Sequence, residues 1–80
     1  MIKLYTYANC PYCEKVRRAF AELDLDYEEI AAERGTPGSL ELMQLGGKQQ
    51  VPFLVDEEEG VFMYESNDII SYAQRRTQKN

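Results

Sequence analysis

The strongest structural signal in this chain lies in Ile2-Lys3-Leu4-Tyr5-Thr6-Tyr7-Ala8-Asn9-Cys10-Pro11-Tyr12-Cys13. The β-branched and aromatic residues at 2–7 predict a short strand, and Ala8-Asn9 predicts a turn. Pro11 suits the first position of a helix, because its missing N–H needs no partner there. Apolar residues then recur at helical spacing and predict a helix from Pro11 to Leu23. Both cysteines of the chain therefore lie where a strand gives way to a helix.

Two cysteines this close together point to redox chemistry. A secreted scaffold held by disulfides usually has more cysteines, spread along the chain. A disulfide between Cys10 and Cys13 closes so short a loop that it constrains the unfolded chain little. Zinc prefers a tetrahedral ligand set, and this chain has no histidine, so only a dimer or added carboxylates would complete such a site. We therefore expect a redox-active dithiol in a reducing compartment and no bound metal.

The remaining sequence predicts alternating elements. Asp26 to Ile30 alternates like a strand, and a helix starts at Thr36-Pro37 and stops at Gly46-Gly47. Two apolar runs, 51–55 and 61–64, predict two strands joined by an acidic hairpin loop at 56–60. Ser66 is the expected cap of a last helix. The expected buried residues are Leu40, Leu42 and Met43 in the second helix and Ile69, Ile70 and Ala73 in the last.

The predicted order β-α-β-α-β-β-α indicates an α/β fold. Its strand–helix–strand start implies a right-handed parallel crossover, and the later hairpin makes the sheet mixed. We expect a four-stranded sheet covered by helices on both faces, with an α+β layer carrying helices on one face as the alternative. At 80 residues the chain is expected to form one domain, residues 1–80.

Composition excludes several classes of function. Fourteen acidic and nine basic residues give a formal charge of −5, which argues against nucleic acid as a partner. No apolar run approaches the length of a membrane span, and the first residues are too polar for a secretory signal. The absence of histidine excludes Ser-His-Asp and Cys-His catalysis. We expect a cytoplasmic monomer that binds neither nucleic acid nor membrane.

Cys10-Pro11-Tyr12-Cys13 at a helix start, followed by Val51-Pro52 before a hairpin, resembles the glutaredoxins of the thioredoxin fold. The resemblance covers nearly the whole chain. The segments 47–52 and 64–69 are most similar to the glutaredoxins related to the N-terminal domain of glutathione transferases. Two departures concern glutathione contacts: Gln50 stands where most glutaredoxins have threonine, and Tyr64-Glu65 stands where most have a glycine pair.

The residues and the resemblance together assign roles. The helix start favours an anion, so Cys10 is the expected nucleophile, and Cys13 resolves the mixed disulfide that forms on Cys10. The resemblance implies that the Val51-Pro52 bond is cis and that the Val51 backbone pairs with glutathione like an added strand. Tyr12 is expected to be exposed beside the bound peptide.

The resemblance also implies where the two ends of glutathione bind. Glu65 and Ser66 are expected to hold the γ-glutamyl end, with Asp68 as a further acceptor for its ammonium group. Lys48, Gln49 and Gln50 are expected near the glycine carboxylate. Lys15 is a candidate to assist the thiolate or attract a carboxylate, whereas Arg17 and Arg18 also fit a solvated helix face.

The sequence predicts a glutathione-dependent thiol–disulfide oxidoreductase that acts on protein–glutathione mixed disulfides and protein disulfides. Glutathione is the expected co-substrate, and no cofactor is expected to be tightly bound. Three alternatives stay open. They are a glutathione transferase N-terminal-like domain, a glutaredoxin-like protein reduced by thioredoxin reductase, and a dimer that holds an iron–sulfur cluster between two Cys10 thiolates and two glutathiones.

Overall fold

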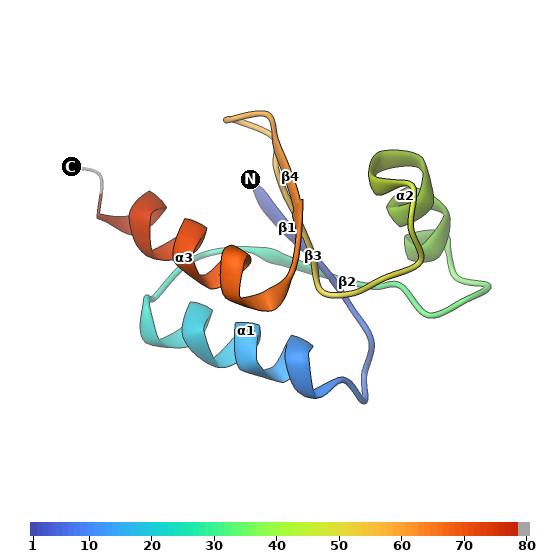
Figure 1. Cartoon of the computed structure of the whole chain (residues 1–80), viewed down its shortest axis with the longest axis horizontal. Helices are drawn as coiled ribbons and strands as arrows, with labels where there is room; N and C mark the ends of the chain where they lie inside the picture. The colour runs from blue at the N-terminus through green and yellow to red at the C-terminus, as the bar shows by residue number, and fades with distance from the viewer. Residues whose placement is uncertain (79–80) are drawn as a thin grey trace.

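The computed structural model describes residues 1–78 and has the predicted order of elements (Figure 1). Each helix and strand begins and ends within a few residues of its predicted place. None of the helices in the described part of the chain is long and apolar enough to cross a membrane. The elements are β1 (Ile2–Thr6), α1 (Pro11–Glu22), β2 (Glu28–Ala31), α2 (Pro37–Gly46), β3 (Phe53–Asp56), β4 (Val61–Tyr64) and α3 (Ser66–Thr77).

The four strands form one mixed sheet in the order β2-β1-β3-β4. Strand β1 runs parallel to β2 and antiparallel to β3, with Tyr5 opposite Phe53. Strand β4 pairs antiparallel with β3 and places Tyr64 on the other side of Phe53. Helices α1 and α3 lie side by side on one face, and α2 lies on the other (Figure 1). This confirms the sheet covered on both faces and excludes the one-face alternative.

Alternation along β1 and β3 divides the core in two. Leu4 and Leu54 face α1 and α3, where they pack with Val16, Phe20 and Ile69. The opposite face has its own cluster beneath α2, made of Tyr5, Ala32, Leu42, Phe53 and Val55. Because the two central strands are buried on both faces, they read as apolar runs in the sequence.

The predicted buried face of α2 is wrong in two of its three residues. Leu42 is buried, but Leu40 is 68% exposed and Met43 is 43% exposed. Helix α2 is rotated about its axis relative to the predicted orientation, because Gly38 packs directly on the end of β2. An added Cβ at Gly38 would lie 1.9 Å from the Ala31 carbonyl oxygen. Tight packing at one glycine therefore overrides the apolar pattern of the helix.

Asp56 is the second correction, because it belongs to β3 and not to the hairpin loop. Its side chain is fully buried. The Tyr72 hydroxyl and the Arg76 Nε donate to its Oδ2 at 2.5 and 2.8 Å. Burial acts to raise the pKa of Asp56, but the hydrogen bonds from Tyr72 and Arg76 outweigh it, so that the pKa is lowered. The buried carboxylate thus ties the end of β3 to α3.

We expect Asp56→Asn to lower the free energy of unfolding at pH 7 by about 2 kcal/mol, since a hydrogen bond to a charged group contributes roughly 1.5–3 kcal/mol. The lowered folded-state pKa means that this contribution is complete above the unfolded pKa of about 3.9 and is lost as pH falls through the folded pKa. Urea unfolding from about pH 5 down to about pH 2.5 should therefore show the gap between wild type and variant closing.

Glu57→Gln is the matched control for that experiment. Glu57 pairs with Lys3 at 3.2 Å on the surface, with 54% of its side chain exposed, and exposed pairs contribute no more than about 1 kcal/mol. An equal loss of stability in both variants would show that the buried network adds nothing beyond an ordinary surface carboxylate.

Candidate functional site

The two cysteines occupy different environments at the start of α1. Cys10 is the N-cap residue, half-buried, and its Sγ accepts a hydrogen bond from the Cys13 N–H at 3.1 Å. Pro11 occupies the first helical position, as predicted. Cys13 is fully buried one turn further along. The Cys10 sulfur therefore lies at the positive end of the helix dipole, with a backbone N–H donor directed at it.

Cys13 is held as a thiol. Burial raises the pKa of Cys13 to about 12, and its hydrogen bond with Cys10 acts in the same direction. Arg17 acts against this shift, but its guanidinium is committed to Glu29 at 2.6 Å and to the Tyr7 carbonyl oxygen at 2.9 Å. Arg17 is thus a link between α1 and the sheet and not part of a solvated helix face.

Glu14 lies beside the dithiol but its charge is compensated. Its carboxylate pairs with Arg17 at 3.3 Å and with Arg18 at 3.9 Å. Its backbone N–H donates to the Cys10 carbonyl oxygen and closes the first turn of the helix. The negative charge of Glu14 is therefore balanced by ion pairs with Arg17 and Arg18 on the same helix.

The Val51-Pro52 peptide bond is cis, as the resemblance implied. Pro52 is buried and Val51 is half-buried. The apolar run that predicted a strand from Val51 becomes a strand only at Phe53, because the cis bond turns the chain before strand pairing begins. The backbone of Val51 therefore lies before the first residue of β3, outside the strand ladder.

The loop before Val51 is fixed by two side chains. The Tyr64 hydroxyl donates to the Lys48 carbonyl oxygen and accepts from the Lys48 N–H, at 2.9 and 3.2 Å. The Gln49 amide donates to the Tyr7 hydroxyl and to the Ala32 carbonyl oxygen. Its oxygen accepts from the Ser39 hydroxyl at 2.6 Å. Gln49 therefore joins the loop to the ends of β1 and β2 and to α2 through its side chain, at a position that the sequence expected near a ligand carboxylate.

The start of α3 differs from the prediction. Glu65 and not Ser66 is the N-cap residue, with φ of +76° and no capping hydrogen bond from its side chain. Ser66 is buried as the first residue of the helix. Since the side chain at the cap position satisfies none of the first-turn N–H groups, these donors are open to a ligand. A non-glycine residue at positive φ is also typical of functional sites.

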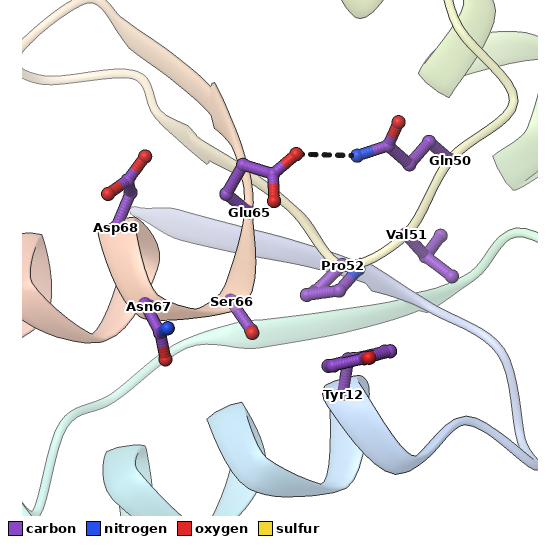
Figure 2. A pocket seen from close by; sticks show the side chains of 8 residues that line it. All are labelled: Tyr12, Gln50, Val51, Pro52, Glu65, Ser66, Asn67 and Asp68. Carbon is purple, nitrogen blue, oxygen red and sulfur yellow. Dashed lines mark hydrogen bonds between the residues drawn. The ribbon is translucent and has the colours of Figure 1, made fainter.

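These segments enclose a pocket of about 560 Å³. Six of the residues that the sequence nominated for ligand binding line it: Tyr12, Gln50, Val51, Pro52, Glu65 and Ser66. Figure 2 shows Tyr12 below Pro52, with the first turn of α3 to their left. The Gln50 Nε2 donates to the Glu65 Oε2 at 3.3 Å across the top of the view. This volume is in the range of small-molecule sites.

The pocket also includes Asn67 and Asp68. Asp68 was considered from the sequence, but Asn67 was missed. Its position in the first turn of α3 was the available signal. Lys15 donates to the Asn67 Oδ1 at 2.5 Å, so Lys15 links the starts of α1 and α3. Lys48 and Gln49 are not among the residues that line the pocket. Within residues 1–78, no group of three or more acidic or cysteine side chains is placed to hold a metal ion.

Comparison with known proteins gives one family and several relatives. Residues 4–80 match the family "Glutathione S-transferase, N-terminal domain". Glutathione S-transferase GstB of Escherichia coli is 34% identical over 74 residues, which are 90% of this chain and 36% of that protein. Glutaredoxin 2 of Escherichia coli is 32% identical over 77 residues, which are 92% of this chain and 33% of that protein.

A solved structure of a glutaredoxin 2 has a fold similar to that of this chain. Glutaredoxin 2 from Salmonella typhimurium in complex with glutathione superposes with a TM-score of 0.81 at 26% identity, over 99% of this chain and 35% of that chain. The chain thus spans about a third of the length of these proteins. The likeness extends over their thioredoxin-like part.

We expect iodoacetamide at about pH 7.5 to alkylate Cys10 and leave Cys13 unmodified in the folded, reduced protein. The thiolate is the reactive form, and a pKa of about 12 leaves Cys13 almost entirely protonated at that pH. Peptide mapping by mass spectrometry checks this, with labelling in urea as the control in which both cysteines react. Equal labelling of both in the folded state would contradict the assigned environments.

Proposed function

The chain belongs to the family of glutathione S-transferase N-terminal domains, and on that premise we propose that it is a glutathione-dependent thiol–disulfide oxidoreductase. It reduces protein–glutathione mixed disulfides and protein disulfides. One observation carries this proposal: the Cys10–Cys13 pair, with an accessible sulfur at a helix start and a buried thiol one turn away. A dithiol of this kind serves disulfide exchange, whereas glutathione transfer to an electrophile needs no second thiol.

The first step is an attack by the Cys10 thiolate on the glutathione sulfur of a mixed disulfide. A bond forms between Cys10 and that sulfur, the old S–S bond breaks, and the protein substrate leaves as a thiolate that takes a proton from water. A second glutathione thiolate then attacks the same sulfur. It releases oxidised glutathione, which contains this molecule and the glutathione taken from the substrate, and it restores the Cys10 thiolate. Overall, one free glutathione is consumed for each protein thiol that is released.

Protein disulfides require Cys13. When Cys10 is bound to a substrate sulfur, it no longer carries a charge, and the repulsion that helps to raise the pKa of Cys13 disappears. Loss of the Cys13 proton then becomes easier, and the Cys13 thiolate displaces the substrate by forming the Cys10–Cys13 disulfide. Burial and the charge of Cys10 therefore keep the resolving thiol protonated until it is needed.

The pocket supplies a place for glutathione. The Val51 backbone is suited to pair with the cysteinyl residue of glutathione in the manner of an added strand. The first-turn N–H groups of α3 and the Ser66 hydroxyl suit the γ-glutamyl carboxylate. Glu65 and Asp68 suit its ammonium group. Val51, Glu65, Ser66 and Asp68 would thus act on one ligand.

The main alternative is a glutathione transferase N-terminal-like domain, which the similarity to GstB supports equally at the level of the family. The other two alternatives are a glutaredoxin-like protein that thioredoxin reductase reduces and a dimer that holds an iron–sulfur cluster. A coupled assay with glutathione and glutathione reductase, run beside one with thioredoxin reductase, separates the reductants. Activity toward an electrophile without disulfide reduction favours the transferase, and a brown colour after anaerobic purification favours the cluster.

We expect a cytoplasmic monomer acting on glutathionylated proteins.

We expect Cys13→Ser to retain removal of glutathione from proteins and to lose most reduction of protein disulfides. Only the second reaction needs an internal resolving thiol. Cys10→Ser should abolish both reactions. The measurement is NADPH consumption coupled to glutathione reductase, with a glutathionylated peptide and an intramolecular protein disulfide as substrates. The reverse pattern would exchange the roles of the two cysteines.

Ser66→Ala should raise the half-saturation for glutathione about tenfold while changing stability little. Loss of a hydrogen bond to a charged ligand group has roughly that effect on affinity. Stability should be spared because the N-cap position is Glu65 and not Ser66. Ser71→Ala, at an exposed position on α3, is the control. A lowered melting temperature with unchanged glutathione kinetics would leave Ser66 a purely structural role.

A further inference from the structure

We propose that Arg17 is a positioning residue for the resolving step, in which its positive charge stabilises the Cys13 thiolate while this sulfur attacks Cys10. The inference rests on the proposed function and adds a residue that assists one of its two thiol steps and not the other. It concerns the reduction of protein disulfides, because the removal of glutathione by Cys10 does not use Cys13.

The side chains of Arg17 and Cys13 meet the backbone of the same residue. Arg17 follows Cys13 by four positions in α1, so the two side chains lie one turn apart on one face of the helix. The Arg17 Nη2 donates to the Tyr7 carbonyl oxygen at 2.9 Å, and a backbone hydrogen bond joins Tyr7 to Cys13. The guanidinium and the buried sulfur are thus brought together at the segment that follows β1.

Two carboxylates fix the guanidinium in this place. The Arg17 Nε donates to the Glu29 Oε2 at 2.6 Å, and the Nη1 pairs with Glu14 at 3.3 Å. The Glu29 Oε2 also accepts from the buried Thr6 hydroxyl at 2.8 Å, so this acceptor is itself held on β1. Only 21% of the Arg17 side chain is exposed. A fixed charge that is largely shielded from water acts on its neighbours more strongly than a charge on a free surface side chain.

The charge of Arg17 remains after the charge of Cys10 is lost. Burial raises the pKa of Cys13 to about 12, and Cys10 adds to this rise through a hydrogen bond and through its charge. The Tyr7 backbone and the Arg17 charge act in the opposite direction. Once the Cys10 sulfur is bound to a substrate, its charge is gone. Among these groups, Arg17 is then the one that carries a full charge, and that charge favours the thiolate.

In the resolving step, the Cys13 sulfur attacks the Cys10 sulfur of the mixed disulfide. The Cys10–Cys13 bond forms, the bond between Cys10 and the substrate sulfur breaks, and the proton of Cys13 ends on the departing substrate thiol. Cys13 is oxidised and the substrate sulfur is reduced. Arg17 exchanges no proton in this step. It lowers the free energy of the negative charge that Cys13 carries before the new bond forms.

The acids around Arg17 make it possible to separate its charge from its contacts. Glu14 of α1 and Glu29 of β2 both pair with the guanidinium, and a negative charge next to a cation offsets part of its field at a third site. The change Glu29→Gln removes such a charge and also weakens the shortest contact of Arg17. A charge role predicts that this change keeps or speeds resolution, whereas a purely structural role predicts that it slows resolution.

The experiment resolves the two thiol steps with the chromogenic disulfide dithiobis(nitrobenzoate), mixed with the reduced protein in a stopped-flow instrument. Attack by Cys10 releases a first nitrothiobenzoate at a rate that rises with the reagent concentration. Attack by Cys13 on the resulting mixed disulfide releases a second one at a rate independent of that concentration. The rates of both phases are recorded as a function of pH, and Cys13→Ser, which lacks the second phase, identifies the first.

We expect Arg17→Gln to slow the second phase about tenfold at neutral pH and to move its pH profile up by about one unit, since a nearby opposite charge lowers a pKa by at least that amount. The first phase should stay within about twofold of the wild type, because Cys13 takes no part in it. Arg17→Lys, which keeps the charge, should restore most of the second-phase rate.

Arg18→Gln is the matched control. It removes the same charge at the next position, where the side chain is 76% exposed and lies 3.9 Å from Glu14. Both phases should keep their wild-type rates in this variant, because an exposed charge is screened by water and salt. An equal slowing of the second phase in Arg18→Gln and Arg17→Gln would reduce the effect to the net charge of the helix and overturn the inference.

Three further results overturn the inference. They are a wild-type second phase in Arg17→Gln, an Arg17→Lys variant as slow as Arg17→Gln, and a Glu29→Gln variant that slows the second phase. The Glu29→Gln result decides by itself if Arg17→Gln does not fold. A wild-type protein without a second phase would refute the resolving role of Cys13 in the proposed function. Two wild-type phases that Arg17→Gln leaves unchanged refute the role of Arg17 alone.

Discussion

The register of β3 between β1 and β4 is the constraint on which the site depends. Tyr5 and Tyr64 both stand opposite Phe53, so the residues just beyond these three positions meet at one edge of the sheet. The three connections concerned are the turn that carries Cys10, the cis bond before Pro52 and the start of α3 at Glu65. A shift of β3 by one residue would turn Leu54 and Val55 to the wrong cores and separate these connections.

Both ends of β3 are anchored by polar side chains. At the site end, Gln49 and Tyr64 hold the loop that leads into the cis bond. At the far end, Asp56 binds Tyr72 and Arg76 of α3. Because α3 also supplies the donors at the pocket, the buried carboxylate at one end of the helix fixes the direction of the helix start at the other end. The helix that Asp56 holds near its C-terminal end is thus the one whose first turn lines the pocket.

The order of elements and the dithiol site were predictable because they rest on local signals. Hydrophobic periodicity identified the helices and strands, and the predicted helix start placed Cys10 and Cys13 correctly at the beginning of α1. The residues that sequence reasoning placed wrongly depend on contacts between distant segments. Met43 is exposed because Gly38 packs on β2. Asp56 is buried because Tyr72 and Arg76 of α3 donate hydrogen bonds to its carboxylate. Neither contact leaves a periodic pattern in the sequence.

The same distinction explains why residues proposed from the sequence line the pocket, while the contacts of their neighbours were not foreseen. A polar residue in a loop before Pro52 is near the ligand by chain position alone, so Gln50 could be nominated from the sequence. Whether a neighbour turns toward the ligand or into the protein depends on what faces it in the fold. Gln49 meets Tyr7, Ser39 and Ala32, groups contributed by three other segments, and satisfying all of them outweighs one solvent-exposed contact with a ligand. The fold therefore determines which polar residues of this loop remain available to line the pocket.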